Sequence, residues 1–125
     1  MNVSSIPLLL VEDEPDLKEA LGEYLEVCGF AVAAAETAEE AFRLAKETPP
    51  QVVLSDLSLP DARGDDFLQE FHRAYPSCLL YVHSGDSSFV PSAGLRAAGL
   101  TPDHVFPKPS DLGSMVTKFR ADLGS

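Results

Sequence analysis

Ionisable side chains follow three apolar runs of this sequence directly. Residues 8–11 lead into three acids at positions 12–14, residues 52–55 end at Asp56, and residues 105–106 precede Lys108 by a single proline. Open α/β sheets place their chemistry at the carboxyl ends of their strands, next to one crevice. We therefore expect carboxylates from two strand ends and an amine from a third to share one site.

The chemistry of such a site is metal-assisted. Glu12, Asp13 and Asp56 offer the hard oxygen ligands that suit Mg²⁺ or Mn²⁺, with waters and a backbone carbonyl completing the shell. A divalent cation also relieves the repulsion among three crowded carboxylates. Carboxylates form aspartyl-phosphates, so Asp56 is a candidate phosphoryl acceptor, and Lys108 would offset charge on the transferring oxygens.

A hydroxyl completes this candidate set. Ser84 ends the apolar run at 79–84 and can donate to a phosphoryl oxygen, and Gly85 after it allows close backbone approach. His83 should point away from Ser84, because successive strand residues face opposite sides, and we expect it to have a structural or surface role.

Each of these residues also has a simpler interpretation. The acids at 12–14 could cap a helix, where negative charge is favourable. Asp56 and Ser84 could form turns, and Lys108 could be an ordinary solvated lysine. All of them fall at strand ends of one predicted layout, and this favours a shared site. The acids at positions 61, 65 and 66 are expected to be solvated.

The elements that must position these residues alternate along the chain. Apolar runs predict strands, and the segments between them carry apolar residues at helical spacing. This pattern predicts an α/β fold, a doubly wound five-stranded parallel sheet of flavodoxin-like order 2-1-3-4-5 with helices on both faces. The predicted strands cover residues 7–11, 30–34, 52–56, 79–84 and 105–107.

Helix boundaries are marked by capping signals. Pro15 suits a first helical position behind an acidic cap, and Gly29 suits a stop. Thr37 and Glu40 read as a capping box. Ser110 or Asp111 is the expected cap of the last helix.

The fourth helix is the weakest. It contains Pro91 and Gly94, which cost about 3 and 1 kcal/mol inside a helix. We expect it to be short, starting near Pro91, or mobile.

Composition limits the partners. The chain has 125 residues, enough for a single domain over 1–125, and a net charge of −11. Such acidity disfavours direct contact with nucleic acid or anionic lipid.

Cys28 and Cys78 are expected to be buried thiols in a reducing cytoplasm. No signal-peptide pattern and no apolar run near the ~20 residues of a membrane span is visible, so the predicted location is cytoplasmic.

Taken together, these residues resemble the receiver domain of two-component response regulators over nearly the whole chain. The resemblance lies in the acids of residues 10–14, in the stretch 53–60 with Gly64 beyond it, in Ser84-Gly85 and in Lys108-Pro109. As a set, these motifs are highly specific.

The resemblance implies a signalling domain that catalyses only its own phosphorylation and dephosphorylation. Asp56 would take a phosphoryl group from a phosphohistidine on a sensor histidine kinase or histidine phosphotransfer protein. Mg²⁺ would be held by Asp13, Asp56 and the Ser58 carbonyl, and through water by Glu12. Ser84 and Lys108 would hold the phosphoryl group.

The resemblance also implies a readout. Phosphorylation would shift the surface made by the fourth helix, fifth strand and fifth helix, which a downstream protein or a covalently linked output domain would read. A phosphorylation-dependent homodimer is a further expectation, as is a cis peptide bond at Pro109.

Two features depart from the family pattern. The switch aromatic of the family lies three residues before the lysine, where this chain has Val105; Phe106 lies two before. We hypothesise that the usual coupling between hydroxyl and aromatic is weakened or absent. The fourth helix also departs, and it belongs to the surface that the family uses for output.

Other functions remain in competition. A pseudo-receiver would use the same fold as a phosphate-independent binding or dimerisation module, although the complete acid, hydroxyl and lysine set argues against it. A haloacid-dehalogenase-like phosphatase would need an aspartate at position 58, where this chain has Ser58. No nucleotide-binding loop is visible. The chain could be a stand-alone receiver or part of a longer regulator or hybrid kinase.

Overall fold

The structure, a computed structural model, describes residues 5–86, 88–108 and 111–124. It contains one parallel sheet with the strand order β2-β1-β3-β4-β5, which confirms the predicted topology. The strands are β1 (Ile6–Val11), β2 (Phe30–Ala35), β3 (Val52–Asp56), β4 (Leu79–Ser84) and β5 (Val105–Pro107). Each matches its predicted range to within one residue.

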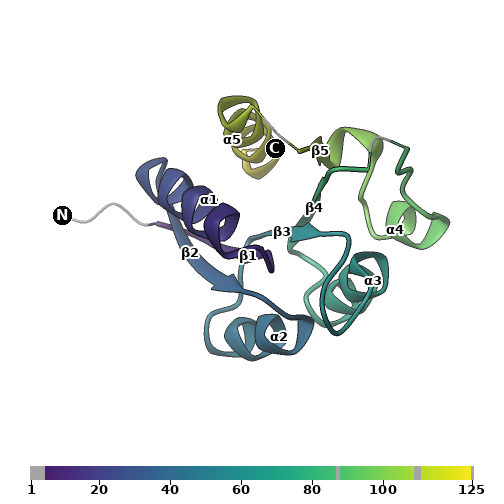
Figure 1. The fold of residues 1–125 in the computed structure, drawn as a ribbon. Helices are drawn as coiled ribbons and strands as arrows, with labels where there is room; N and C mark the ends of the chain where they lie inside the picture. Colours follow the sequence, from purple (N-terminus) through teal and green to yellow (C-terminus); the bar gives the residue numbers. More distant parts are fainter. Residues whose placement is uncertain (1–4, 87, 109–110, 125) are drawn as a thin grey trace.

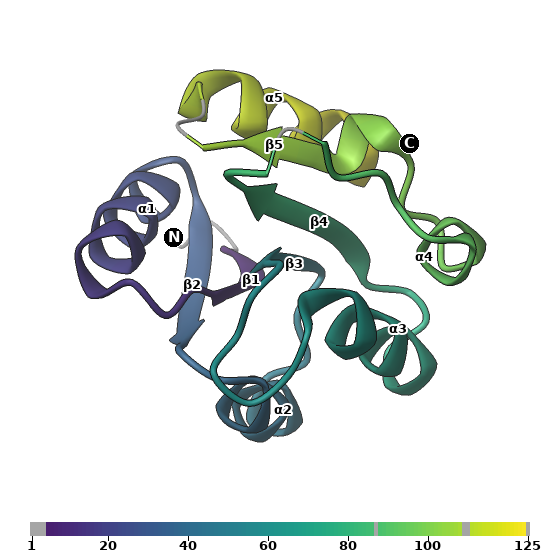
Figure 2. The same ribbon diagram turned by 45° about the vertical axis from the view of Figure 1, so that its right-hand side comes forward.

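Helices cover both faces of the sheet (Figures 1 and 2). The helices α1 and α5 lie on one face, and α2, α3 and α4 lie on the other. Their bounds are α1 (Pro15–Val27), α2 (Ala38–Glu47), α3 (Gly64–Ala74), α4 (Ala93–Ala97) and α5 (Leu112–Leu123). A 3-10 turn, η1 (Pro102–His104), precedes β5.

The two core layers follow from the alternation of side chains along β1. Leu8 and Leu10 pack with α1 and α5, whereas Leu9 and Val11 pack with the helices on the opposite face. All four are at most 1% exposed. A strand buried on both sides is what a continuous apolar run predicts.

The start of α1 differs in one respect from the sequence-based expectation. Pro15 is the first helical residue and Gly29, with φ of 101°, follows the helix end, both as predicted. The acidic cap is wrong, because the side chain of Glu14 makes no capping hydrogen bond. Instead, the Glu14 amide donates to the Glu12 carboxylate at 3.2 Å, so the turn is ordered from the strand end.

The helix α2 is capped from two directions. Thr37 Oγ1 accepts from the Glu40 amide at 3.0 Å, which confirms half of the capping box, but Glu40 Oε1 accepts from the amide of Glu36 rather than of Thr37. Asp61 adds a second cap, because its two carboxylate oxygens accept from the amides of residues 38 and 39 at 2.8 and 3.0 Å. Asp61 was expected to be solvated only; these hydrogen bonds also lower the pKa of its carboxyl.

The helix α4 is short, as predicted, and α3 holds it in place. Ser92 caps it by accepting from the Leu95 amide at 3.1 Å. Asp65 Oδ1 accepts from Ser92 Oγ at 3.1 Å and from the Gln69 side chain at 2.5 Å, so the expectation that Asp65 is merely solvated is wrong. The contact with Gln69 lies within α3, whereas Ser92 is 27 residues away in sequence. Asp66, in contrast, is exposed as expected.

The last helix, α5, is capped by Asp111, whose carboxylate accepts from the amides of Gly113 and Ser114. Ser110 and the predicted cis bond at Pro109 lie outside the described residues. No helix in the described ranges is both long enough and apolar enough to span a bilayer.

Candidate functional site

The carboxyl ends of four strands meet at one edge of the sheet. Val11 is paired with Ser55, so the residues that follow them, Glu12 and Asp56, lie at the same level of the sheet edge. Ser84 is paired with Pro107 in the same way, and this places Lys108 beside the end of β4. Strand register alone therefore brings together groups that are up to 96 residues apart in sequence.

Three carboxylates gather there as predicted. Glu12, Asp13 and Asp56 each offer an oxygen, and these oxygens lie within 4.8 Å of one another. Glu12 is 1% exposed, Asp56 is half-buried and Asp13 is exposed. The set is open on the Asp13 side, where a cation and its waters can enter. Hard oxygen donors of this kind fit Mg²⁺ or Mn²⁺.

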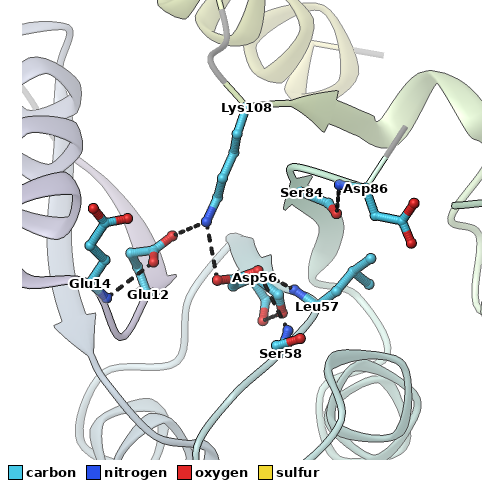
Figure 3. A network of polar contacts seen from close by, with 9 residues as sticks. Glu12, Glu14, Asp56, Leu57, Ser58, Ser84, Asp86 and Lys108 are labelled. Atoms are coloured by element: carbon cyan, nitrogen blue, oxygen red, sulfur yellow. Dashed lines mark hydrogen bonds and ion pairs between the residues drawn. The ribbon is translucent and has the colours of Figure 1, made fainter. Parts of the chain in front are cut away.

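Lys108 joins two of these carboxylates (Figure 3). Its ammonium Nζ lies 3.0 Å from Glu12 Oε1 and 3.1 Å from Asp56 Oδ2. Burial disfavours the charge of Lys108, but the hydrogen bonds to both carboxylates outweigh burial and raise its pKa. Burial raises the pKa of Glu12, against the lowering effect of the Lys108 hydrogen bond. The lysine thus supplies the positive charge that a crowded acid cluster requires.

The two oxygens of Asp56 have different surroundings. Oδ2 faces Lys108, whereas Oδ1 accepts from the Leu57 amide at 2.7 Å and from the Ser58 amide at 3.5 Å. These bonds fix the orientation of the carboxylate. Sequence patterns gave no sign of the Leu57 amide, because a backbone donor has no residue-type signature.

Ser84 lies beside this cluster without joining its hydrogen bonds. It is 5% exposed, and its Oγ accepts from the Asp86 amide at 2.9 Å, while its carbonyl accepts from the Lys108 amide at 2.9 Å. A hydroxyl keeps its proton free to donate when it accepts one bond. The backbone bond ties the position of Lys108 to the end of β4.

Gly64 shapes the loop after Asp56. Its amide donates to the Leu57 carbonyl at 2.6 Å, and a Cβ at this position would lie 2.4 Å from the Asp56 carbonyl oxygen. Both neighbours belong to the backbone, so they cannot move aside as a flexible side chain would. Close approach explains why this position carries glycine.

His83 points to the face opposite Ser84, as predicted. It lines a cleft with residues of α1 and with Leu112, whereas Ser84 lines a cavity with Phe89 and Val105 on the other side. His83 is only 3% exposed, so its role is in the interior rather than at the surface. Burial, and then the charge of Lys108, lower its pKa to about 4, so the ring is neutral at pH 7.

Val105 and Phe106 occupy opposite faces of β5. Val105 packs against the core under α2, α3 and α4, on the side of Ser84. Phe106 packs against Tyr81 and Phe119, with ring centroids 5.9 and 5.8 Å apart. The cavity beside Ser84 has a volume of about 350 Å³. The strand β5 contributes Val105 to its lining, and the loop after β4 contributes an aromatic side chain, Phe89.

Comparison with known protein families gives a decisive match. The family model described as "Response regulator receiver domain" matches residues 8–120. This chain belongs to the response regulator receiver family. Receiver domains are signalling modules of two-component systems rather than enzymes, and the acidic cluster of Glu12, Asp13 and Asp56 is consistent with the phosphoacceptor site of such a domain.

Individual relatives agree with this assignment. The chain is 32% identical over 114 residues to the transcriptional regulatory protein KdpE of Mycobacterium tuberculosis, covering 91% of this receiver and 49% of that protein. It is 36% identical over 75 residues to a cyclic di-GMP phosphodiesterase of Thermotoga maritima, covering 60% of this receiver and 20% of the relative. The chain thus spans about half, or less, of these relatives.

The fold agrees with solved receivers as well. A CheY-like receiver domain from Methanospirillum hungatei superposes with a TM-score of 0.86 at 26% identity, covering 97% of this chain and 95% of that one.

Proposed function

We propose that this receiver accepts a phosphoryl group on Asp56 and uses the modification to change a protein-binding surface. The observation that carries the proposal is the convergence of Asp56 with Glu12, Asp13 and Lys108 at one sheet edge. The half-buried Asp56 carboxylate is held by backbone amides on one oxygen, and this leaves the oxygen beside Lys108 as the attacking atom.

In the proposed transfer, Asp56 Oδ2 attacks phosphorus and forms a new P–O bond, while the bond from phosphorus to the donor group breaks. From a protein donor the leaving group is a histidine nitrogen; from acetyl phosphate it is acetate. Lys108 would turn from the Asp56 carboxylate to the phosphoryl oxygens, and Ser84 would donate its hydroxyl proton to one of them.

The residues that would hold Mg²⁺ are Asp13 and Asp56 directly, Ser58 through its carbonyl and Glu12 through water. When bound, the cation would offset negative charge between the carboxylates and the incoming phosphoryl group. Mn²⁺ satisfies the same oxygen donors.

The partners follow from the chemistry of this transfer. The donor would be a phosphohistidine on a sensor histidine kinase or histidine phosphotransfer protein, in the cytoplasm. The readout would be a downstream protein, a linked output domain or a phosphorylation-dependent homodimer. Movement of Ser84 would break the hydrogen bond that its hydroxyl accepts from the Asp86 amide. The change at the site would then be transmitted to the loop that leads to α4.

Intact-protein mass spectrometry tests the proposal. The protein is incubated with acetyl phosphate, with Mg²⁺ or with EDTA, as wild type and as Asp56→Asn. We expect an addition of about 80 Da that requires both the metal and Asp56. No adduct after rapid quenching, together with no response to beryllofluoride, would instead identify a pseudo-receiver that binds its partners without phosphate.

A further inference from the structure

A second cleft lies on the opposite side of β4 from the Ser84 cavity. It has a volume of about 410 Å³ and is bordered by α1, by the end of β4 and by the start of α5. Most of its wall is apolar, from Leu17, Ala20, Leu21 and Leu112. Figure 2 shows α1 and α5 on this side of the sheet. A cleft of this size and lining has the character of a small-molecule site.

Within the part of the chain that the structure describes, one polar side chain in the wall of this cleft has no hydrogen-bond partner. His83 is 3% exposed, and neither ring nitrogen has a hydrogen-bond partner among the described residues. Burying such a group without a partner costs about 1–3 kcal/mol. The ring torsion of histidine has a broad energy well, so a small rotation can present a nitrogen to a molecule in the cleft.

Charge limits what the cleft can accept. Glu14 stands at its rim, and the chain carries a net charge of −11, so an anion is disfavoured. Lys108 also lines the cleft and disfavours a cation. The ammonium of Lys108 already contacts two carboxylates, which leaves His83 as the polar anchor.

We propose that the cleft between α1 and α5 binds a small, uncharged, mainly apolar molecule that donates one hydrogen bond to His83. A neutral imidazole has one acceptor nitrogen and one N–H donor. A single N–H or O–H group of the guest therefore satisfies the acceptor nitrogen. The apolar body of the guest would cover the leucines of α1 and α5.

Indole and 1-methylindole are suitable probes, because they share one apolar body and only indole donates a hydrogen bond. Titrations of the ¹⁵N-labelled protein without Mg²⁺ or any phosphoryl donor should give saturable shifts at residues 17, 20, 21, 83 and 112. Indole should bind about fivefold more tightly than 1-methylindole. The carboxylate of indole-3-carboxylate should weaken binding.

Variants test the assignment to His83 and to this cleft. His83→Leu should bring the ratio of the two dissociation constants close to one. Ala20 is exposed at the rim, so Ala20→Phe should block the cleft and abolish the saturable shifts. Ala74→Phe, the same change at an exposed position of α3, should leave indole binding unchanged. If Ala20→Phe does not give a folded circular dichroism spectrum, Ala20→Leu replaces it.

Equal affinity of wild type for the two probes, shifts scattered outside the cleft, or indole binding that survives the blocking change would each overturn the proposal. The acetyl phosphate adduct is measured separately, so failure of the cleft proposal and failure of phosphoryl uptake are distinguishable.

Discussion

Lys108 illustrates how a single residue stabilises the site before any cation or phosphoryl group arrives. It bridges Glu12 and Asp56 at 3.0 and 3.1 Å and so offsets the repulsion between them. Asp13 lies outside this bridge among the described contacts. In the proposed transfer, the same ammonium would move to the phosphoryl oxygens, because a bound metal ion would take over the neutralisation of the carboxylates.

His83 gives the first prediction. Its pKa is about 4 in the folded protein against 6.5 ordinarily, so the unfolded chain takes up the proton at a higher pH. Its contribution to stability is therefore complete above pH 6.5 and is lost as the pH falls toward 4. Between pH 7 and pH 5 the loss should be about 2 kcal/mol.

Urea unfolding of wild type and His83→Leu at the two pH values measures this effect. The variant should lose less stability on acidification, since leucine has no proton to bind. Equal losses in the two proteins would show that other groups cause the acid sensitivity.

At the scale of elements, the loop from β3 to α3 sets the position of Ser58 relative to Asp56. Ser58 forms an isolated antiparallel bridge with Arg63, and Gly64 packs on the backbone of Asp56 and Leu57. The chain thus returns on itself immediately after Asp56. A loop fixed by backbone contacts is sensitive to added volume.

Gly64→Ala should therefore cost about 1–3 kcal/mol of folding free energy, the usual range for overpacking, and should slow phosphoryl uptake. The control is Gly22→Ala inside α1, where the new methyl group would meet only Val32 Cγ1 at 3.9 Å. Helix propensity predicts a gain of up to about 1 kcal/mol there. Chemical denaturation and the acetyl phosphate adduct measure both effects; a tolerated Gly64→Ala would contradict the close-packing explanation.

The two faces of the strand β5 belong to different core layers. Phe106 belongs to the aromatic cluster with Tyr81 and Phe119, on the face opposite Ser84. Phe106 is only partly buried, so we expect Phe106→Ala to destabilise the fold by about 2–3 kcal/mol, less than the loss at a fully buried phenylalanine, while phosphoryl uptake persists. Thermal unfolding and adduct formation give the two readouts. Loss of uptake in a protein that remains folded would assign Phe106 to the switch.

For the whole molecule, charge sets the response to cations. The chain carries 20 acidic and 9 basic residues, a net charge of −11, and three of the carboxylates meet at the sheet edge. Binding of Mg²⁺ to the folded state alone should stabilise the protein by about 2.7 kcal/mol at a hundredfold excess over the dissociation constant. Thermal unfolding with Mg²⁺ or EDTA measures this gain.

Asp13→Asn should raise the stability of the metal-free protein, because it removes like-charge repulsion, and should abolish most of the gain from Mg²⁺. Glu70→Gln makes the same change of charge at an exposed position of α3 and should leave the gain intact. An undiminished Mg²⁺ response in Asp13→Asn would remove Asp13 from the metal ligands.

The sequence by itself was sufficient for the strand order and for the gathering of Glu12, Asp13, Asp56 and Lys108. Apolar runs buried on both faces and right-handed crossovers leave few arrangements, and each of these residues lies at a strand end or within two residues of it. Local signals also predicted that α1 starts at Pro15 and that α4, in a segment that holds a proline and a glycine, is short.

Only the tertiary structure decided which groups meet across the chain. Asp61 caps α2 and Asp65 holds Ser92, and the sequence predicted neither contact. The groups that donate to these two carboxylates lie 22–27 residues away, so they leave no local pattern. Packing also explains two further features: the His83 ring finds no hydrogen-bond partner among the described residues, and Gly64 closely approaches Asp56. Periodicity assigns a residue to a face of a strand or helix, but the neighbours it meets there are fixed only when the elements pack.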